Sequence, residues 1–274
     1  MHNDLSLIFF ENPISRTYLH IAKMRNFKFR KIIVLQKKNL FPNFLYKKFN
    51  YYKMNSYPLN FLKQKKYNKI ISEISEYFGF KSDFFQSVYS ENKLEDYSDE
   101  IEYLDTNNIN SKLFIDKVIK KKYFTYLNTG NQIYKKIFDF PVKILHIHPG
   151  YLPNTRGADA SLWNVHNLNF LSATSFIMNQ NIDTGIILNR TSYKIPNFKT
   201  KTLISLPNDM LYRFWFSFID PILRGKHFEN KILEFPNIKN DIDLDININE
   251  DSQYYSFMKT DKFKDTFEKV FKFD

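Results

Sequence analysis

Two histidines and an aspartate in the middle of the chain are groups that could do acid–base or metal chemistry. His146 and His148 lie two residues apart in the run KILHIHPG, and Asp183 follows in NIDTG. If the run is a strand, both imidazoles point to the same face of it. Because imidazole changes charge near neutral pH, a histidine beside a carboxylate can take up and release a proton during a reaction.

The residues around the histidines predict where this group lies in a fold. Ile144 to Ile147 is an apolar run typical of a short buried strand, and Pro149-Gly150 ends it directly after His148. In open α/β sheets, ligands bind at the carboxyl ends of strands. The sequence therefore predicts a ligand site at the end of this strand, with the Asp183 turn between two further strands.

The N-terminal part of the chain predicts a parallel sheet. Leu5 to Phe10 and Lys31 to Leu35 are apolar runs, and Asn12-Pro13 begins a helical pattern that continues towards Met24. Strand, helix and strand in this order predict a βαβ unit with parallel strands. The dinucleotide fingerprint G-x-G-x-x-G is absent after Phe10.

The same patterns predict the remaining elements. Strands are expected at Glu102–Leu104, Tyr123–Leu127, Ser172–Met178 and from Ile186 onwards. Helices are expected at Lys66–Phe78, Asn110–Lys120, Gln132–Phe138, Ala158–His166 and Thr202–Leu223, the last with a break or second start at Pro207. Residues 39–67 have no clear period and predict an irregular connection. Residues 225–274 predict a polar tail in which DIDLDININ alternates like a one-sided strand.

These elements predict an α/β protein with a Rossmann-like, open, mostly parallel sheet, helices on both faces and a small C-terminal extension. We expect a catalytic domain at 1–200, followed by a helix and a small extension at 201–274 that packs on it. The apolar C-terminal half would also allow a homodimer.

The composition excludes several classes of protein. The chain of 274 residues has no cysteine, so disulfides and thiolate chemistry are excluded. Its net charge of +11 comes from scattered lysines without an Arg-rich arm, so we expect no nucleic-acid partner, although a basic surface favours anionic ligands. No apolar run is long enough to span a membrane, and the N-terminus lacks a signal peptide, so we expect a cytoplasmic protein without a membrane partner.

The motif HIHPGYLPNTRGAD, followed by a strand and NIDTG, resembles the N10-formyltetrahydrofolate-dependent formyltransferases. That family includes the glycinamide ribonucleotide, methionyl-tRNA and nucleotide-sugar formyltransferases. Its ordered pattern matches His148-Pro149, Leu152-Pro153, Arg156-Gly157 and Ile182–Gly185, and a strand threonine matches Thr174. The match covers about residues 123–190, and the conjunction of motifs is more specific than any one of them.

The resemblance implies a role for each matching residue. The catalytic residues would be His146, His148 and Asp183. The folate donor would contact Thr129, Gly130, Leu152, Pro153, Thr174, Met178, Asn181 and Thr184. The amine substrate would contact Arg156, Gly157 and Asp159. N10-formyltetrahydrofolate would be the formyl donor, and the resemblance implies no metal.

Three positions depart from the family pattern. His146 stands where the family has a catalytic asparagine, Gly150 replaces a serine, and Asn181 replaces a glycine. Asparagine tolerates the left-handed backbone that a glycine turn needs, so the last change is mild. In the family the asparagine donates a hydrogen bond to the formyl oxygen, and an imidazole N–H can do the same.

Within the family, elimination favours an amino-sugar acceptor. The segment after Asp183 shows no barrel domain of the kind in the tRNA enzyme, and Glu11-Asn12-Pro13 replaces the Gly-rich phosphate loop of the purine enzyme. We therefore expect formyl transfer to a nucleotide-linked amino sugar for polysaccharide biosynthesis. Two alternatives remain: a non-catalytic or divergent folate- or sugar-binding relative, and a metal-dependent hydrolase with His146, His148 and Asp183 as ligands.

Overall fold

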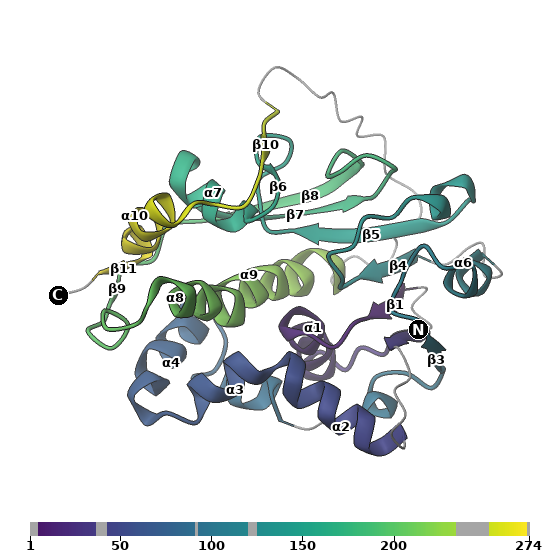
Figure 1. Cartoon of the computed structure of the whole chain (residues 1–274), viewed down its shortest axis with the longest axis horizontal. Helices are drawn as coiled ribbons and strands as arrows, with labels where there is room; N and C mark the ends of the chain where they lie inside the picture. The colour runs from purple at the N-terminus through teal and green to yellow at the C-terminus, as the bar shows by residue number, and fades with distance from the viewer. Residues whose placement is uncertain (1–4, 37–42, 91–92, 120–124, 234–251, 273–274) are drawn as a thin grey trace.

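The computed structural model describes the chain except residues 1–4, 37–42, 91–92, 120–124, 234–251 and 273–274. Its centre is a seven-stranded sheet in the order β3-β2-β1-β4-β5-β7-β8 (Figure 1). The strands are β1 (Leu5–Phe9), β2 (Ile32–Gln36), β3 (Ile101–Asp105), β4 (Thr125–Asn128), β5 (Lys143–His148), β7 (Leu171–Ile177) and β8 (Ile186–Tyr193). The first five are parallel, whereas β7 runs antiparallel to β5 and β8 antiparallel to β7. The predicted α/β class and mostly parallel sheet are confirmed.

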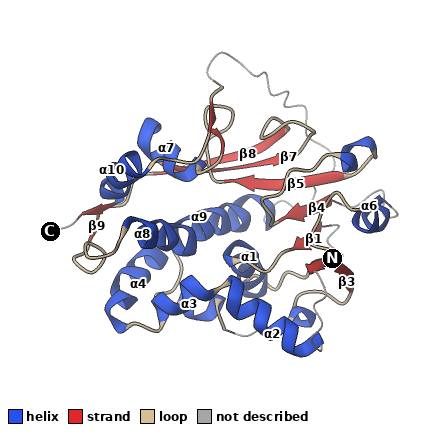
Figure 2. Ribbon diagram, viewed as in Figure 1, coloured by secondary structure: helices blue, strands red, loops and turns tan. Residues whose placement is uncertain are grey.

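The helices and short turns lie on both faces of this sheet (Figure 2). The α-helices are α1 (Pro13–Met24), α2 (Asn43–Met54), α3 (Ser56–Leu62), α4 (Asn68–Tyr77), α5 (Phe84–Val88), α6 (Lys112–Ile119), α7 (Ala160–Leu168), α8 (Asn208–Phe214), α9 (Asp220–His227) and α10 (Thr260–Val270). The 3₁₀ turns are η1 (Lys65–Tyr67), η2 (Leu94–Asp96) and η3 (Lys136–Asp139), and the π-helical turns are η4 (Trp215–Ile219) and η5 (Phe228–Leu233).

Side chains alternate between two hydrophobic cores along each central strand. Leu7 of β1 packs in the core that contains α1, α4, α5, α8 and α9, whereas Ile8 packs in the core under α6 and η3. In β5, Leu145 packs in the first of these cores and Ile144 in the second. This period of two is what a sheet covered on both faces requires. It also places His146 and His148 on the face of Ile144.

The first helix begins as its sequence predicts. The Asn12 side chain accepts a hydrogen bond from the Ser15 N–H, and Ser15 Oγ accepts one from the Asn12 N–H, so the two residues form a reciprocal cap. Pro13 occupies the first helical position, where its missing N–H costs nothing. The cap therefore fixes the direction in which the chain leaves the carboxyl end of β1.

A continuous helix from residue 208 to 233 crosses the first core beside α1 and the sheet (Figure 1). Pro221 lies inside it and cannot donate to the carbonyl of Ser217, so the helix widens into the π-helical turn η4 just before that proline. The freed Ser217 carbonyl accepts a hydrogen bond from the Tyr89 hydroxyl at 3.1 Å. Asp220 and Arg224 follow this turn.

Several predicted elements differ from the structure. The helix expected from Thr202 begins only at Asn208 after Pro207, and it continues through 225–233, which we had assigned to a polar tail. Residues 39–67, expected to be irregular, contain α2 and α3. The expected DIDLDININ strand lies outside the described residues, as do Lys120, Tyr123 and Phe124.

The helix predicted at Gln132–Phe138 is only the short turn η3. Side-chain hydrogen bonds to the loop after β3 hold these residues out of a helix. Gln132 Nε2 donates to the Asn107 carbonyl at 2.6 Å, and Asn110 Nδ2 donates to the Ile133 carbonyl at 2.9 Å. These bonds join residues 25 and 23 positions apart in the chain, so no sequence period reveals them.

The C-terminal segment is tied back to the sheet by two small parallel pairs. β6 (Arg156–Gly157) pairs with β10 (Tyr254–Tyr255), and β9 (Phe198–Lys199) pairs with β11 (Phe271–Lys272). Residues on both sides of position 200 share the first hydrophobic core. The domain boundary at 200 remains a prediction.

We expect Gly185→Ala to destabilise the fold and displace the Asp183 turn. A Cβ at this position would lie 1.7 Å from the carbonyl oxygen of Ile177, and this backbone oxygen cannot turn aside as a flexible side chain would. The expected loss is about 3 kcal/mol in the free energy of unfolding, measured by urea denaturation. Gly79→Ala is the matched control, since Gly79 has a φ of +77° but its nearest added contact is 3.6 Å away. That variant should lose about 1 kcal/mol, and equal losses would contradict the steric explanation.

Candidate active site

The two histidines and the aspartate meet at the carboxyl end of β5. Asp183 lies in the turn between β7 and β8, and its Oδ1 is 3.7 Å from Nδ1 of His148. The His148 side chain is 4% exposed and the Asp183 side chain 12% exposed, so bulk water barely screens the pair. Both residues line a cavity of about 520 Å³. The structure thus places in one site the residues that the sequence singles out.

The hydrogen bonds of His148 fix which nitrogen is free. Its Nε2 lies 2.8 Å from the carbonyl oxygen of Thr155. A carbonyl oxygen can only accept, so Nε2 carries the proton and the lone pair of the neutral ring is on Nδ1. Nδ1 is the nitrogen nearest Asp183. His148 can therefore accept a proton at the position where the carboxylate stabilises the resulting charge.

The turn that carries Asp183 is held by its own polar groups. Asp183 has a φ of +52°, a conformation that short polar side chains tolerate. Its Oδ2 accepts the Gly157 N–H at 2.8 Å, which leaves Oδ1 towards His148. The Asn179 side chain closes the turn with bonds to the Asn181 N–H and to both the hydroxyl and the carbonyl of Thr184. Thr184 and Asn181 therefore shape the turn.

His146 is oriented by Asn128 at the end of the neighbouring strand β4. Asn128 Oδ1 accepts the Gly130 N–H and the Tyr134 hydroxyl, each at 2.9 Å, which fixes the orientation of the amide. Asn128 Nδ2 then lies 3.2 Å from Nδ1 of His146 and donates to it. The proton of the neutral His146 ring is therefore on Nε2. This N–H has no partner among the residues that the structure describes.

Burial keeps both histidines neutral. It lowers the pKa of His146, and the nearby Arg224 cation lowers it further, against the opposing charge of Asp183. Burial also lowers the pKa of His148, partly offset by Asp183 and by the hydrogen bond to Thr155. At neutral pH the site thus offers a free base on His148 and an N–H donor on His146.

A second cavity, of about 470 Å³, adjoins the first. The two share six lining residues: Ile14, Gly130, Asn131, Gln132, His146 and Arg224. The second cavity lies at the carboxyl ends of β1, β2 and β4, where the strand order reverses direction between β1 and β4. Such a switch point is where open α/β sheets bind ligands. His146 and Arg224 therefore stand where two separate ligands would meet.

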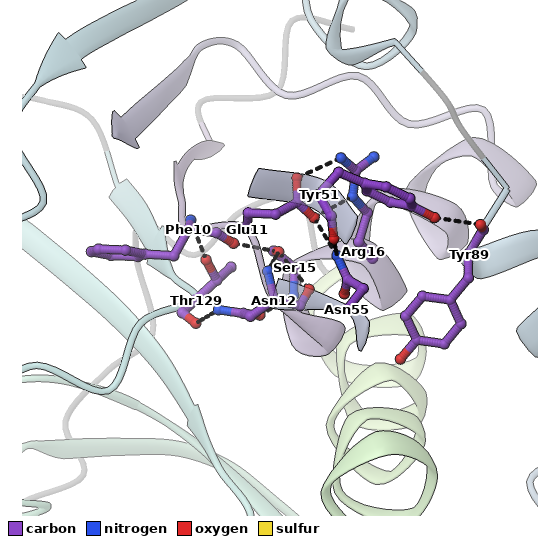
Figure 3. A network of polar contacts seen from close by, with 9 residues as sticks. All are labelled: Phe10, Glu11, Asn12, Ser15, Arg16, Tyr51, Asn55, Tyr89 and Thr129. Atoms are coloured by element: carbon purple, nitrogen blue, oxygen red, sulfur yellow. Dashed lines mark hydrogen bonds and ion pairs between the residues drawn. The ribbon is translucent and has the colours of Figure 1, made fainter. Parts of the chain in front are cut away.

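A buried polar network surrounds Glu11, which lines the second cavity (Figure 3). Both oxygens of Glu11 accept from Arg16, at 2.7 and 2.6 Å, and Asn55 Nδ2 donates to Oε1 at 2.9 Å. The Arg16 guanidinium also lies over the Tyr51 ring. Removing one partner of such a buried ion pair costs about 3–5 kcal/mol, so this network fixes the chain after β1.

The segment after His148 is ordered by Thr174 from β7. The Thr174 hydroxyl donates to the Gly150 carbonyl at 2.7 Å and accepts the Leu152 N–H at 3.2 Å. The Leu152-Pro153 bond is cis. Thr174 and Leu152 are fully buried, so their contacts fix the path of the chain that follows His148.

Eight of the predicted site residues line the first cavity: Gly130, His146, His148, Gly157, Asp159, Met178, Asn181 and Asp183. Thr129 lines the second cavity. Five predicted residues line neither: Leu152, Pro153, Arg156, Thr174 and Thr184. Their predicted contacts with folate or substrate stay predictions.

Asp159 and Arg156 flank Gly157 but differ in their surroundings. Asp159 accepts the Tyr212 hydroxyl at 2.7 Å and the Met258 N–H at 2.9 Å, so it joins α8 and the C-terminal segment to the cavity wall. Arg156 pairs through its backbone with β10, and its Nε is buried without a hydrogen-bond partner among the described residues. Asp159 therefore has a defined structural task at the site.

Sequence reasoning missed Asn128, Thr155 and Arg224. Asn128 could have been found, since it is the polar residue that ends a predicted strand next to the histidine strand. Thr155 contributes only its carbonyl, and Arg224 lies 41 positions after Asp183 in a segment that reads as core helix. No spacing rule connects either of them to the motif.

Among the residues that the structure describes, no group of three His, Asp or Glu side chains is arranged to hold a metal ion. No helix in the described ranges is both long and apolar enough to cross a membrane.

The buried histidines predict that acid destabilises the fold. Burial lowers the pKa of His146, His148 and His227 from 6.5. Below about pH 6.5 the unfolded chain therefore binds more protons than the folded one, and stability falls as pH falls towards the lowered values. We expect the free energy of unfolding in urea to be lower at about pH 5.5 than at about pH 7.5, with a smaller difference in His227→Gln. Equal stability at both pH values would contradict this.

No protein-family model and no curated protein matches the chain. Among solved structures, it is similar to a sugar N-formyltransferase from a Shewanella species, with 12% identity over 97% of this chain and 87% of the other, at a TM-score of 0.47. It is also similar to an N-formyltransferase from Helicobacter canadensis in complex with folinic acid and dTDP-3-aminofucose, with 14% identity over 92% and 70% and a TM-score of 0.48. A third similar structure is a 4-N formyltransferase from Francisella tularensis, with 15% identity over 93% of this chain and 77% of the other, at a TM-score of 0.45. Likenesses this distant carry no argument about function, which rests on the site.

Proposed function

We propose that the chain is an enzyme that transfers a formyl group from N10-formyltetrahydrofolate to an amine, and that the acceptor is a nucleotide-linked amino sugar. The observation that carries the proposal is the His148–Asp183 pair, with Nδ1 of His148 free and 3.7 Å from the carboxylate. The pair lies beside a second histidine whose Nε2–H has no partner in the described part of the chain. The resemblance of the motif adds the chemical class.

These residues match the needs of formyl transfer. An amine that attacks a formyl carbon gains a positive charge and must lose a proton, while the formyl oxygen gains negative charge. Nδ1 of His148 takes the proton, and Asp183 stabilises the imidazolium. The Nε2–H of His146 donates to the oxygen. The carbon–nitrogen bond to the acceptor forms, the bond to the donor nitrogen breaks, and His148 returns its proton to that leaving nitrogen.

The first cavity fits a folate donor. Its volume of about 520 Å³ lies within the usual range for small-molecule sites, and its wall includes the apolar side chains of Ile133, Met178 and Ile182. Met178, Asn181 and Gly130 would hold the donor, which supplies the activated formyl group. The adjoining second cavity offers room for the amine, so the two ligands would meet beside His146. This placement differs from the predicted acceptor contacts with Gly157 and Asp159, which line the first cavity.

The residues at the carboxyl end of β1 favour binding of a sugar over binding of a phosphate group there. Glu11 replaces a Gly-rich phosphate loop, and the buried Arg16 beside it is committed to both Glu11 oxygens and not to an anionic ligand. Carboxylate and amide oxygens accept hydrogen bonds from hydroxyl and amino groups. With this acceptor we propose a cytoplasmic role in polysaccharide biosynthesis. We propose no nucleic-acid or membrane partner, and a homodimer as the assembly.

The acceptor class is tested by incubating the protein and N10-formyltetrahydrofolate with nucleotide-linked amino sugars, glycinamide ribonucleotide and methionyl-tRNA in parallel. We expect release of tetrahydrofolate and a mass gain of one formyl group only with an amino sugar. Turnover of either other substrate would overturn the acceptor assignment. Tight folate binding without turnover of any amine would favour a non-catalytic binder, and a stoichiometric bound transition metal would favour a metal-dependent hydrolase.

A further inference from the structure

Arg224 on α9 is the one arginine or lysine that lines either cavity in the described part of the chain. It lines both of them, as His146 does. Its side chain is 13% exposed. A cation this well buried is costly unless other groups hold it, so its partners show what the position is built for.

Two groups hold one side of the Arg224 guanidinium. Its Nε donates to Asp220 Oδ2 at 2.8 Å, and its Nη1 donates to the Ile147 carbonyl at 2.7 Å. Asp220 is 1% exposed and also accepts from Ser161 Oγ at 3.2 Å. Ile147 lies between the two histidines in β5. The guanidinium is therefore fixed against the strand that carries the reacting groups.

The remaining donors of Arg224 are uncommitted. A guanidinium has five N–H donors, and Nη2 has no hydrogen-bond partner among the described residues. The Nε2–H of His146, on the same border between the cavities, is free as well. Donors fixed in advance at such a place are suited to an oxygen that gains negative charge.

The charges around Arg224 give it a second effect. The charged groups that act on the two rings are Asp183 from the β7–β8 turn and Arg224 and Asp220 from α9, and His148 also acts on His146. Among these groups Arg224 is the permanent cation, and it lowers the pKa of both rings. It therefore opposes protonation of the base and of the donor ring.

We propose that Arg224 is an anion-binding residue of the reaction centre, which donates Nη2–H bonds together with His146 Nε2–H to the oxygen that gains negative charge. This rests on the proposed formyl transfer. Arg224 then compensates for the histidine that stands in place of an asparagine, because it supplies a charged donor from outside the motif. Its charge also explains why Asp220 is buried beside it.

The test compares Arg224→Lys with the double variant Asp220→Asn/Arg224→Met. Arg224→Met alone would leave the buried Asp220 carboxylate unpaired and is expected to unfold the protein. Lysine keeps the charge but not the planar fork, and the double variant removes both charges. Arg213→Met is the matched control, since Arg213 lies on α8 over the Tyr57 ring and lines neither cavity.

For kcat/KM of formyl transfer we expect losses of about 10-fold in Arg224→Lys and about 100-fold or more in the double variant, mainly in kcat. A second readout does not need turnover. Sodium formate, an anion of the size of the transferred group, is titrated against sodium chloride while the imidazole signals of His146 and His148 are followed by NMR. We expect saturable formate binding in the wild type and in Arg213→Met, and weaker binding in both Arg224 variants.

Wild-type kcat/KM in both folded Arg224 variants would overturn the proposal. Unchanged formate affinity would also overturn it, even with lost activity, because Arg224 would then act by another route. If the wild type transfers formyl to no acceptor, the proposed function fails. The anion-binding role of Arg224 is then decided by the formate titration alone.

Discussion

His148→Ala is expected to lower kcat/KM for formyl transfer by about 10²–10⁴-fold, the usual contribution of a positioned general base. The variant removes the only imidazole lone pair that faces Asp183 in the described structure. Without it the amine proton has no acceptor near neutral pKa when the carbon–nitrogen bond forms. Substrate binding should change little, so the loss should appear in kcat more than in KM.

The controls for His148→Ala separate chemistry from folding. His166→Ala removes a histidine of α7 that lines neither cavity and should keep wild-type activity. Circular dichroism and urea unfolding check that His148→Ala is folded, because the Thr155 carbonyl loses its partner. Added imidazole should restore part of the activity by entering the space left behind. A folded His148→Ala variant with wild-type kcat would rule out His148 as the base.

Asp183→Asn is expected to lower kcat by about 100-fold. Asparagine keeps the shape, tolerates the φ of +52° and can still accept the Gly157 N–H, so the turn should remain in place. The charge beside Nδ1 of His148 is lost, and the new amide NH2 takes the place of Oδ1, where it would donate to the Nδ1 lone pair. Because that charge raises the pKa of His148, the acid limb of the kcat/KM profile should move to lower pH.

The direction of that pH shift distinguishes the two charges at the site. Loss of Asp183 should move the acid limb to lower pH. In Asp220→Asn/Arg224→Met, loss of the Arg224 cation raises the pKa of His148 and loss of Asp220 partly offsets this, so the acid limb should move slightly to higher pH. Asp209→Asn, in the exposed first turn of α8, is the matched control and should change neither rate nor profile. A shift of the acid limb to higher pH in Asp183→Asn would contradict the assigned electrostatics.

The sheet could be predicted from the sequence because its strands are short apolar runs that end in polar or turn residues. Leu5–Phe9 and Lys143–His148 are such runs, and both are strands. The helix predicted at Gln132–Phe138 was wrong, because side-chain hydrogen bonds from Asn110 and Gln132 override a weak helical pattern. The helix after Pro207 continues beyond its predicted end at Leu223, because the polar residues Arg224 and Glu229 that follow are held by ion pairs with Asp220 and Arg25.

The site could be predicted only as far as it is local in sequence. His146, His148 and Asp183 follow from strand ends and turn residues, and the structure places them together. Asn128 acts through the orientation of its side-chain amide, and Thr155 acts through its backbone carbonyl. Arg224 reaches the site from a helix packed against the sheet. Those depend on tertiary contacts. The tautomers of both histidines, and thus which one is base and which donor, follow only from these contacts.

The most direct test of a formyl-transfer site is a single-turnover experiment with a donor that carries an isotopic label in its formyl carbon. The donor is mixed with excess protein and a nucleotide-linked amino sugar, and the label is followed by mass spectrometry. We predict that the label appears in a new amide on the sugar, in equal amount to the tetrahydrofolate released. Label that stays on a tightly bound donor, or that leaves as formate with every amine offered, would contradict formyl transfer at His148 and Asp183.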